Sequence, residues 1–168
     1  MTTSGRLRIE AATEKDLGVI LGLIRELAEY EQLAHLVVAT EADLRHSLFG
    51  EPRVAEAALA LVDGRPVGYA LWFYTFSTFL GKRGLYLEDL FVVPDARGAG
   101  IGRALLTYLA RIAIVRGCGR IEWSVLKWNE PAIRFYEGLG ARPIDGWTVY
   151  RLAGDALREV GEGRRGKG

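Results

Sequence analysis

The sequence predicts an α/β protein in which strand-like and helix-like segments alternate within one domain. Segments whose apolar residues recur at every second position are followed by segments whose apolar residues have helical spacing. The dipeptide Asp63-Gly64 lies between two apolar runs and is typical of a β-hairpin turn. A chain of 168 residues, 49% of them apolar, is long enough to bury one full core. We expect a single domain over residues 4–153 and a short extension over residues 154–168.

The first part of the chain predicts one strand and two helices. Residues 7–11 alternate apolar and charged side chains, as a half-buried strand does. Thr13 is a suitable helix cap, and apolar residues then recur at helical spacing over residues 17–30. Thr40 is expected to cap a second, shorter helix that ends at about Phe49.

The middle of the chain predicts most of the sheet and one long helix. Residues 55–62 and 66–80 flank the hairpin turn, and residues 83–93 continue the sheet. A helix with a continuous apolar face follows the glycine-rich segment, beginning near Ile101 and stopping near Gly117.

The last part of the chain predicts two further strands and a helix between them. Residues 121–126 and 147–152 have the composition of strands. A helix is expected after Asn129, where Pro131 falls in the first turn and is tolerated. From Gly161 the chain is rich in glycine and charge, which predicts a disordered end.

Bulk properties exclude several classes of function. A net charge of +1 does not suggest a nucleic-acid partner. The longest apolar run, residues 69–80, is too short to cross a bilayer. Cys118 is the only cysteine, which rules out an internal disulfide and fits the reducing cytoplasm. The two histidines are too isolated for a metal site. We therefore expect a cytoplasmic protein with no metal, no membrane and no nucleic acid among its partners.

The most informative segment joins the strand over residues 83–93 to the following helix through a glycine-rich loop. Glycines at alternate positions let a ligand approach the backbone, and a helix N-terminus attracts phosphate. The spacing lacks the third glycine of a dinucleotide-binding turn and the Gly-Lys-Ser/Thr ending of a nucleotide-triphosphate loop. It fits the pattern Arg-x-x-Gly-x-Gly, which binds the diphosphate of coenzyme A. The residues that match it are Arg97, Gly98, Ala99, Gly100, Ile101 and Gly102.

Three ordered motifs resemble the GCN5-related N-acetyltransferases (GNAT family), and within them the diamine and thialysine acetyltransferases. They are Tyr86-Leu87-Glu88-Asp89, the glycine loop, and Trp128-Asn129-Glu130-Pro131 followed by Phe135-Tyr136. The resemblance runs from about Leu7 to Leu152. It implies the acyl-CoA N-acyltransferase fold, a mostly antiparallel, splayed mixed sheet flanked by helices, with acetyl-CoA in the cleft. It also implies a homodimer and direct transfer of the acetyl group to a small primary amine in a ternary complex.

The resemblance implies specific roles at the cofactor site. The residues that would bind acetyl-CoA are Leu90, Phe91, Val92, the loop residues 97–102, Arg103, Asn129 and Tyr136. The backbone of the strand residues would contact the pantetheine arm, and the Leu90 N–H would polarise the thioester carbonyl. Asn129 would bond the arm while also capping its helix.

The resemblance also implies the catalytic pair. Glu88 would be the base, directly or through a water, and Tyr136 the acid that protonates the leaving thiolate. Alternation along a strand predicts that Glu88 and Asp89 point to opposite faces. The alternatives that remain open are a strand carboxylate paired with an arginine at Glu88 and a packed helix tyrosine at Tyr136.

Substrate contacts are expected from Tyr30, Glu31, Glu88, Asp89, Ser77 and Thr78. Polyamine-acetylating relatives carry Asp-Pro-Trp where this chain has Ser77-Thr78-Phe79. Hydroxyls can bond a carboxylate that an aspartate would repel, so the preferred acceptor is thialysine or a lysine-like amino acid. Glu31 could equally be a solvated residue at a helix end.

The sequence leaves other functions open. The first alternative is a diamine or polyamine acetyltransferase of the spermidine/spermine type. Further alternatives are a non-catalytic acyl-CoA-binding sensor and a protein-lysine acetyltransferase.

Overall fold

The computed structural model describes residues 6–164, which form two compact units. The first unit ends at Leu126 and contains the sheet, and the second begins at Lys127. The prediction of one domain over residues 4–153 stays a prediction.

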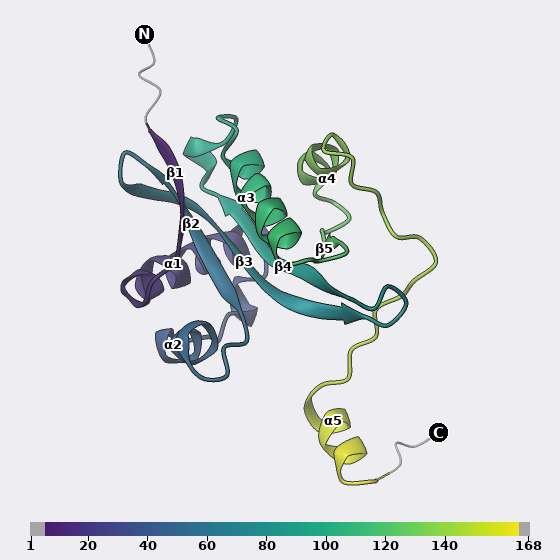
Figure 1. Ribbon diagram of the computed structural model, residues 1–168. Helices are drawn as coiled ribbons and strands as arrows, with labels where there is room; N and C mark the ends of the chain where they lie inside the picture. The colour runs from purple at the N-terminus through teal and green to yellow at the C-terminus, as the bar shows by residue number, and fades with distance from the viewer. Residues whose placement is uncertain (1–5, 165–168) are drawn as a thin grey trace. The chain divides into compact units, whose positions relative to one another are not determined.

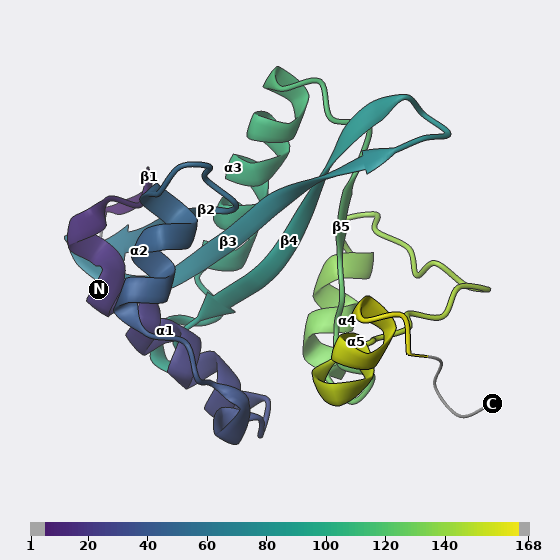
Figure 2. The ribbon, with the colours of Figure 1, turned by 90° about the horizontal axis from the view of Figure 1, so that it is seen from below.

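The first unit is built on a five-stranded sheet in the order β1-β2-β3-β4-β5 (Figure 1). Its strands are β1 (Leu7–Ala11), β2 (Glu56–Val62), β3 (Arg65–Ser77), β4 (Lys82–Val92) and β5 (Ile121–Trp123). The first four pair antiparallel, and β4 pairs with β5 in parallel. The expected mixed, mostly antiparallel sheet is thus confirmed. β3 extends beyond the end of β2, and its last residues form a two-stranded ribbon with the start of β4, which Figure 2 shows.

Helices cover both faces of the sheet (Figure 1). On one face lie α1 (Leu17–Tyr30) and α2 (Glu41–Phe49), whose apolar residues form a core with buried residues of β2, β3 and β4. On the other face lies α3 (Ile101–Val115), where the ring of Tyr108 meets Trp72 edge-on at 6.3 Å between centroids. The Thr40 side chain caps α2 as expected, accepting a hydrogen bond from the Asp43 N–H.

One extra residue interrupts the pairing of β3 with β4. Leu87 pairs with Trp72, whereas Leu71, the next residue back on β3, pairs with Asp89. Glu88 is therefore the inserted residue of a β-bulge. The pairing of β4 with β5 also ends at Leu87, so the two parallel strands separate at the same point. The end of the β4–β5 pairing at the bulge agrees with the splayed sheet that the family resemblance implied.

The second unit differs from the sequence prediction in its last part. α4 (Glu130–Glu137) forms as expected, but residues 147–152, predicted to be a strand, have no regular secondary structure. No strand pairs with them within residues 6–164, and the side chains of Trp147 and Val149 are 80% and 90% exposed. An apolar pattern can favour a strand, but only a hydrogen-bonded neighbour makes one.

A helix that the sequence did not predict, α5 (Gly154–Gly161), forms at the start of the C-terminal extension. The predicted disordered end covers residues 161–168, of which residues 165–168 lie outside the described residues. The strand predicted over residues 121–126 is shorter than expected, because its pairing with β4 ends at Trp123.

An ion pair fastens the end of α3 to the sheet. The Arg116 guanidinium donates to both carboxylate oxygens of Glu56 on β2 and to the Tyr74 hydroxyl on β3. The Trp72 indole N–H also reaches the Tyr74 oxygen, at 3.4 Å. Two donors on one carboxylate give a fixed geometry that a lysine cannot reproduce.

We predict that Arg116→Ala lowers the free energy of unfolding by about 1 kcal/mol, because a partly exposed bidentate pair is lost. Arg116→Lys should recover less than half of that loss. Arg111→Ala is the matched control, since Arg111 lies on the same helix with no ion pair within residues 6–164. Urea unfolding measures all three variants, and equal losses at both positions would contradict the prediction.

Candidate active site

The glycine loop lies between β4 and α3 and has the conformation that a phosphate site needs. Gly98 and Gly100 have φ angles of +81° and +78°, which side-chain-bearing residues adopt at a cost. A Cβ atom built on either glycine would meet no atom within 4 Å. Gly100 is the N-cap of α3 and has no side chain to bond the first N–H groups of the helix. The loop therefore leaves donors at a helix N-terminus open to an anion, which fits a diphosphate.

The other predicted cofactor residues lie on the loop, in the first turn of α3 and on β4. Ile101 is the first residue of α3, and its side chain is buried in the core. Ala99 lies in the loop, and Gly102 and Arg103 lie in the first turn of α3. Leu90, Phe91 and Val92 lie on β4 beyond its pairing with β5. Their backbone edge on that side has no strand neighbour within residues 6–126, so it is available to the amides of a ligand.

The Arg97 side chain has partners on the substrate side of the predicted site. Its guanidinium carbon lies 4.5 Å from the ring centre of Tyr30 and 5.5 Å from that of Phe91. Its Nε donates to the Val92 carbonyl at 2.9 Å. The cofactor contact expected for this arginine stays a prediction, and in the structure its guanidinium joins the loop to the end of α1 through a cation–π contact.

The bulge decides how the two carboxylates of β4 are arranged. Strict alternation predicted opposite faces for Glu88 and Asp89, and that premise is wrong because the register shifts between them and their neighbours on β3. Asp89 pairs with Leu71, which packs against the α1 core, and its Oδ2 accepts a 2.8 Å hydrogen bond from the Tyr69 hydroxyl. Burial raises the pKa of Tyr69, and the charges of Asp89 and Glu88 raise it further. The carboxylates of Glu88 and Asp89 therefore both influence the Tyr69 hydroxyl.

Burial and charge perturb the ionisation of this group. Burial raises the pKa of Asp89, the Tyr69 hydrogen bond lowers it, and the charge of Glu88 raises it further. Burial, and then the charge of Asp89, raise the pKa of Glu31 at the end of α1. Within residues 6–164 none of Glu31, Glu88 and Asp89 has an ion pair. Three carboxylates without a cation form a site that attracts an ammonium group.

Four of the predicted substrate residues thus come together: Tyr30, Glu31, Glu88 and Asp89. Ser77 and Thr78 do not join them. Ser77 ends β3 and is buried, and its Oγ accepts from the Leu80 N–H at 3.2 Å. Leu71, which pairs with Asp89, lies six residues earlier on the same strand, a separation of about 20 Å along it.

The two remaining predicted residues belong to the second unit. Asn129 is the buried N-cap of α4, and its Oδ1 accepts from the Ala132 N–H at 3.3 Å. The capping role expected for it is confirmed. Tyr136 lies on α4 with its ring 5.3 Å from that of Phe135.

Sequence reasoning missed Tyr69. It reads as one apolar residue of a buried strand, and no local signal distinguishes it from its core neighbours. Only the shifted register of β4 brings a carboxylate to its hydroxyl.

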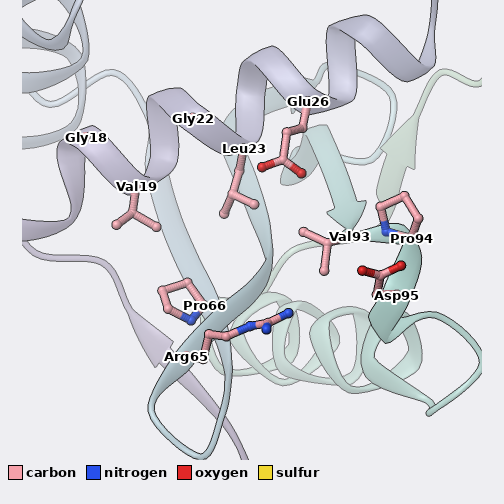
Figure 3. A pocket seen from close by; sticks show the side chains of 10 residues that line it. All are labelled: Gly18, Val19, Gly22, Leu23, Glu26, Arg65, Pro66, Val93, Pro94 and Asp95. Atoms are coloured by element: carbon pink, nitrogen blue, oxygen red, sulfur yellow. The ribbon is translucent and has the colours of Figure 1, made fainter.

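A separate open pocket of about 550 Å³ lies beside α1 in the same unit (Figure 3). Its charged residues are Glu26 on α1, Arg65 at the start of β3 and Asp95 after β4. The lining does not include the three carboxylates described above. The part of the chain that the structure describes contains no group of residues suited to a metal ion, and no helix there is long and apolar enough to cross a membrane.

Comparisons with known proteins agree on one family. The family model of the acetyltransferase (GNAT) family matches residues 21–141. A thialysine N-epsilon-acetyltransferase of Mus musculus is 39% identical, covering 91% of this chain and 96% of that protein. An L-ornithine N5-acetyltransferase of Arabidopsis thaliana is 32% identical over 91% of this chain and 87% of its own length.

A solved structure of an integron cassette protein from the mobile metagenome of V. cholerae superposes with a TM-score of 0.78. It is 29% identical and covers 93% of this chain and 98% of its own. The family model spans the open edge of β4, the glycine loop and α4. This chain therefore belongs to the GNAT acetyltransferase family and is an N-acetyltransferase.

Proposed function

We propose that the chain transfers an acetyl group from acetyl-CoA to the side-chain amine of thialysine or a similar lysine-like amino acid. The observation that carries the proposal is the group of three carboxylates, without a cation, at the point where β4 leaves β5. The names of the thialysine and ornithine acetyltransferases among its relatives support a basic amino acid as acceptor.

Acetyl-CoA, when bound, supplies an acetyl thioester. The N–H groups of residues 98–103 would hold its diphosphate, because Gly98 and Gly100 leave the backbone of the loop uncovered. The open edge of β4 at Leu90–Val92 bonds the pantetheine amides, and the Leu90 N–H polarises the thioester carbonyl. We assign cofactor contacts to Asn129 and Tyr136 as well, because both residues match the family motif.

Deprotonation of the acceptor is the first chemical requirement. An alkylamine of pKa near 10.4 is only about 0.1% neutral near pH 7.4, and the ammonium form has no lone pair. Glu88 accepts this proton, directly or through a water, since it is exposed at the bulge. Asp89 and Glu31 attract the ammonium form, and Tyr136 then protonates the leaving thiolate.

The amino-acid end of the acceptor needs a separate contact. The exposed Thr78 offers a hydroxyl that can bond a carboxylate, whereas Ser77 is buried; both lie about 20 Å along β3 from the residue opposite Asp89. We place this contact in the site of a second copy, because family members are commonly homodimers with sites shared between chains. The exposed apolar side chains of Trp147 and Val149 support such an interface. A cytoplasmic location is proposed from the single cysteine.

A thiol-release assay over a panel of acceptors tests the proposed function. With acetyl-CoA present, thialysine, lysine and ornithine should give the highest kcat/KM, ahead of putrescine and spermidine and of lysine-containing peptides. Preference for the diamines would assign a polyamine acetyltransferase instead. Binding of acetyl-CoA with no acceptor stimulating thiol release would overturn the proposal in favour of a sensor.

We predict that Glu88→Gln lowers kcat by about 100-fold or more, the usual contribution of a general base. The remaining rate should rise with pH toward the pKa of the free amine, because only the neutral amine then reacts. Initial rates from pH 6 to 10 give the profile. Glu10→Gln, a strand carboxylate on β1, is the control. An unchanged profile in Glu88→Gln would mean that Glu88 is not the base.

We predict that Tyr136→Phe lowers kcat by about 100-fold while the Kd for acetyl-CoA stays within about twofold, since only the proton donor is removed. Stopped-flow turnover and calorimetric titration measure the two quantities. Tyr150→Phe, at a 93% exposed position of the same unit, should change neither. Wild-type turnover in Tyr136→Phe would exclude it as the acid.

A further inference from the structure

Tyr69 has a hydroxyl that its place in the core does not explain. The residue is 0% exposed and lies in the core between β3 and α1, where a phenylalanine would fill the same space. Its hydroxyl nevertheless has a single partner within residues 6–164, the Asp89 Oδ2 at 2.8 Å. A buried polar atom needs such a partner, and here the partner is a carboxylate of the amine site.

We propose that Tyr69 is a positioning residue whose hydrogen bond keeps the Asp89 carboxylate charged and aimed at the acceptor amine. The inference rests on the proposed acetyl transfer and deepens it. Tyr69 acts through Asp89, because its own hydroxyl is enclosed by the core and does not reach solvent.

The surroundings of Asp89 make this bond necessary. Glu31 faces it from the end of α1, and Glu88 precedes it on the bulge of β4. The Arg97 guanidinium, from the loop, lies over the rings of Tyr30 and Phe91 and makes no ion pair with Asp89. Burial and the charge of Glu88 thus act against ionisation of Asp89, and the Tyr69 hydroxyl opposes them.

Loss of the Tyr69 hydroxyl changes the pKa of Asp89 in a direction that these contacts determine. Burial and Glu88 raise the pKa of Asp89, and the hydrogen bond from Tyr69 lowers it. Removal of the hydroxyl therefore raises the pKa of Asp89 further. The carboxylate then becomes protonated at a pH where the wild-type carboxylate is charged, and its attraction for the ammonium group is lost.

The first test is Tyr69→Phe, assayed with acetyl-CoA and the best amine of the acceptor panel. The acidic limb of kcat/KM for the amine should move upward by about one pH unit, because a hydrogen bond to a charged group is lost. Near neutral pH the KM for the amine should rise by about tenfold, while the KM for acetyl-CoA stays within about twofold. Tyr74→Phe is the control, since it removes a hydroxyl of the same strand that bonds Trp72 and Arg116.

The second test repeats Tyr69→Phe in an Asp89→Asn background. Asparagine does not titrate, so loss of the Tyr69 hydroxyl should then leave the acidic limb where Asp89→Asn alone places it. Thermal unfolding of every variant separates a lost fold from a changed site. Asp89→Asn alone should also alter the acidic limb of kcat/KM for the amine, because asparagine has no carboxylate to titrate.

The experiments distinguish a failure of the proposed function from a failure of the positioning role of Tyr69. If the wild-type chain acetylates no amine, the proposed function is wrong. If the wild type is active but Tyr69→Phe keeps its pH profile, or shifts it equally in the Asp89→Asn background, only the positioning role is overturned.

Discussion

The bulge at Glu88 is the constraint on which the rest of the first unit depends. Before it, Leu87 pairs with Trp72 on the α3 side of the sheet, and after it Phe91 belongs to the core beneath α1. The pairing of β4 with β5 stops at the same residue. One inserted residue therefore opens a backbone edge and gathers two carboxylates beside it.

The site brings together carboxylates whose like charges repel one another in the folded protein. Glu31, Glu88 and Asp89 raise the pKa values of their neighbours, and no cation of the described residues pairs with them. Such an arrangement costs stability and is typical of a functional site. A cationic acceptor relieves the repulsion, so binding and chemistry use the same charges. The Arg97 contact with Tyr30 links this acidic group to the loop suited to a diphosphate.

Much of the fold could be predicted because its signals are local. The helical spacing of α1 and α3, the cap at Thr40 and the hairpin turn at Asp63-Gly64 each depend on residues close in sequence. The predicted strand over residues 147–152 failed for the opposite reason. A strand needs a neighbour, and the pattern of one segment does not contain its neighbour.

The sequence predicts the glycine loop, its position after a strand and before a helix, and the presence of Glu88, Asn129 and Tyr136 at the spacing of an acetyltransferase. These depend on residue type and order, which local backbone chemistry reads directly. Tertiary structure alone decided that Asp89 meets Tyr69 and that Arg97 meets Tyr30. Those contacts join residues far apart along the chain, and a register shift of one residue determines which side chains meet.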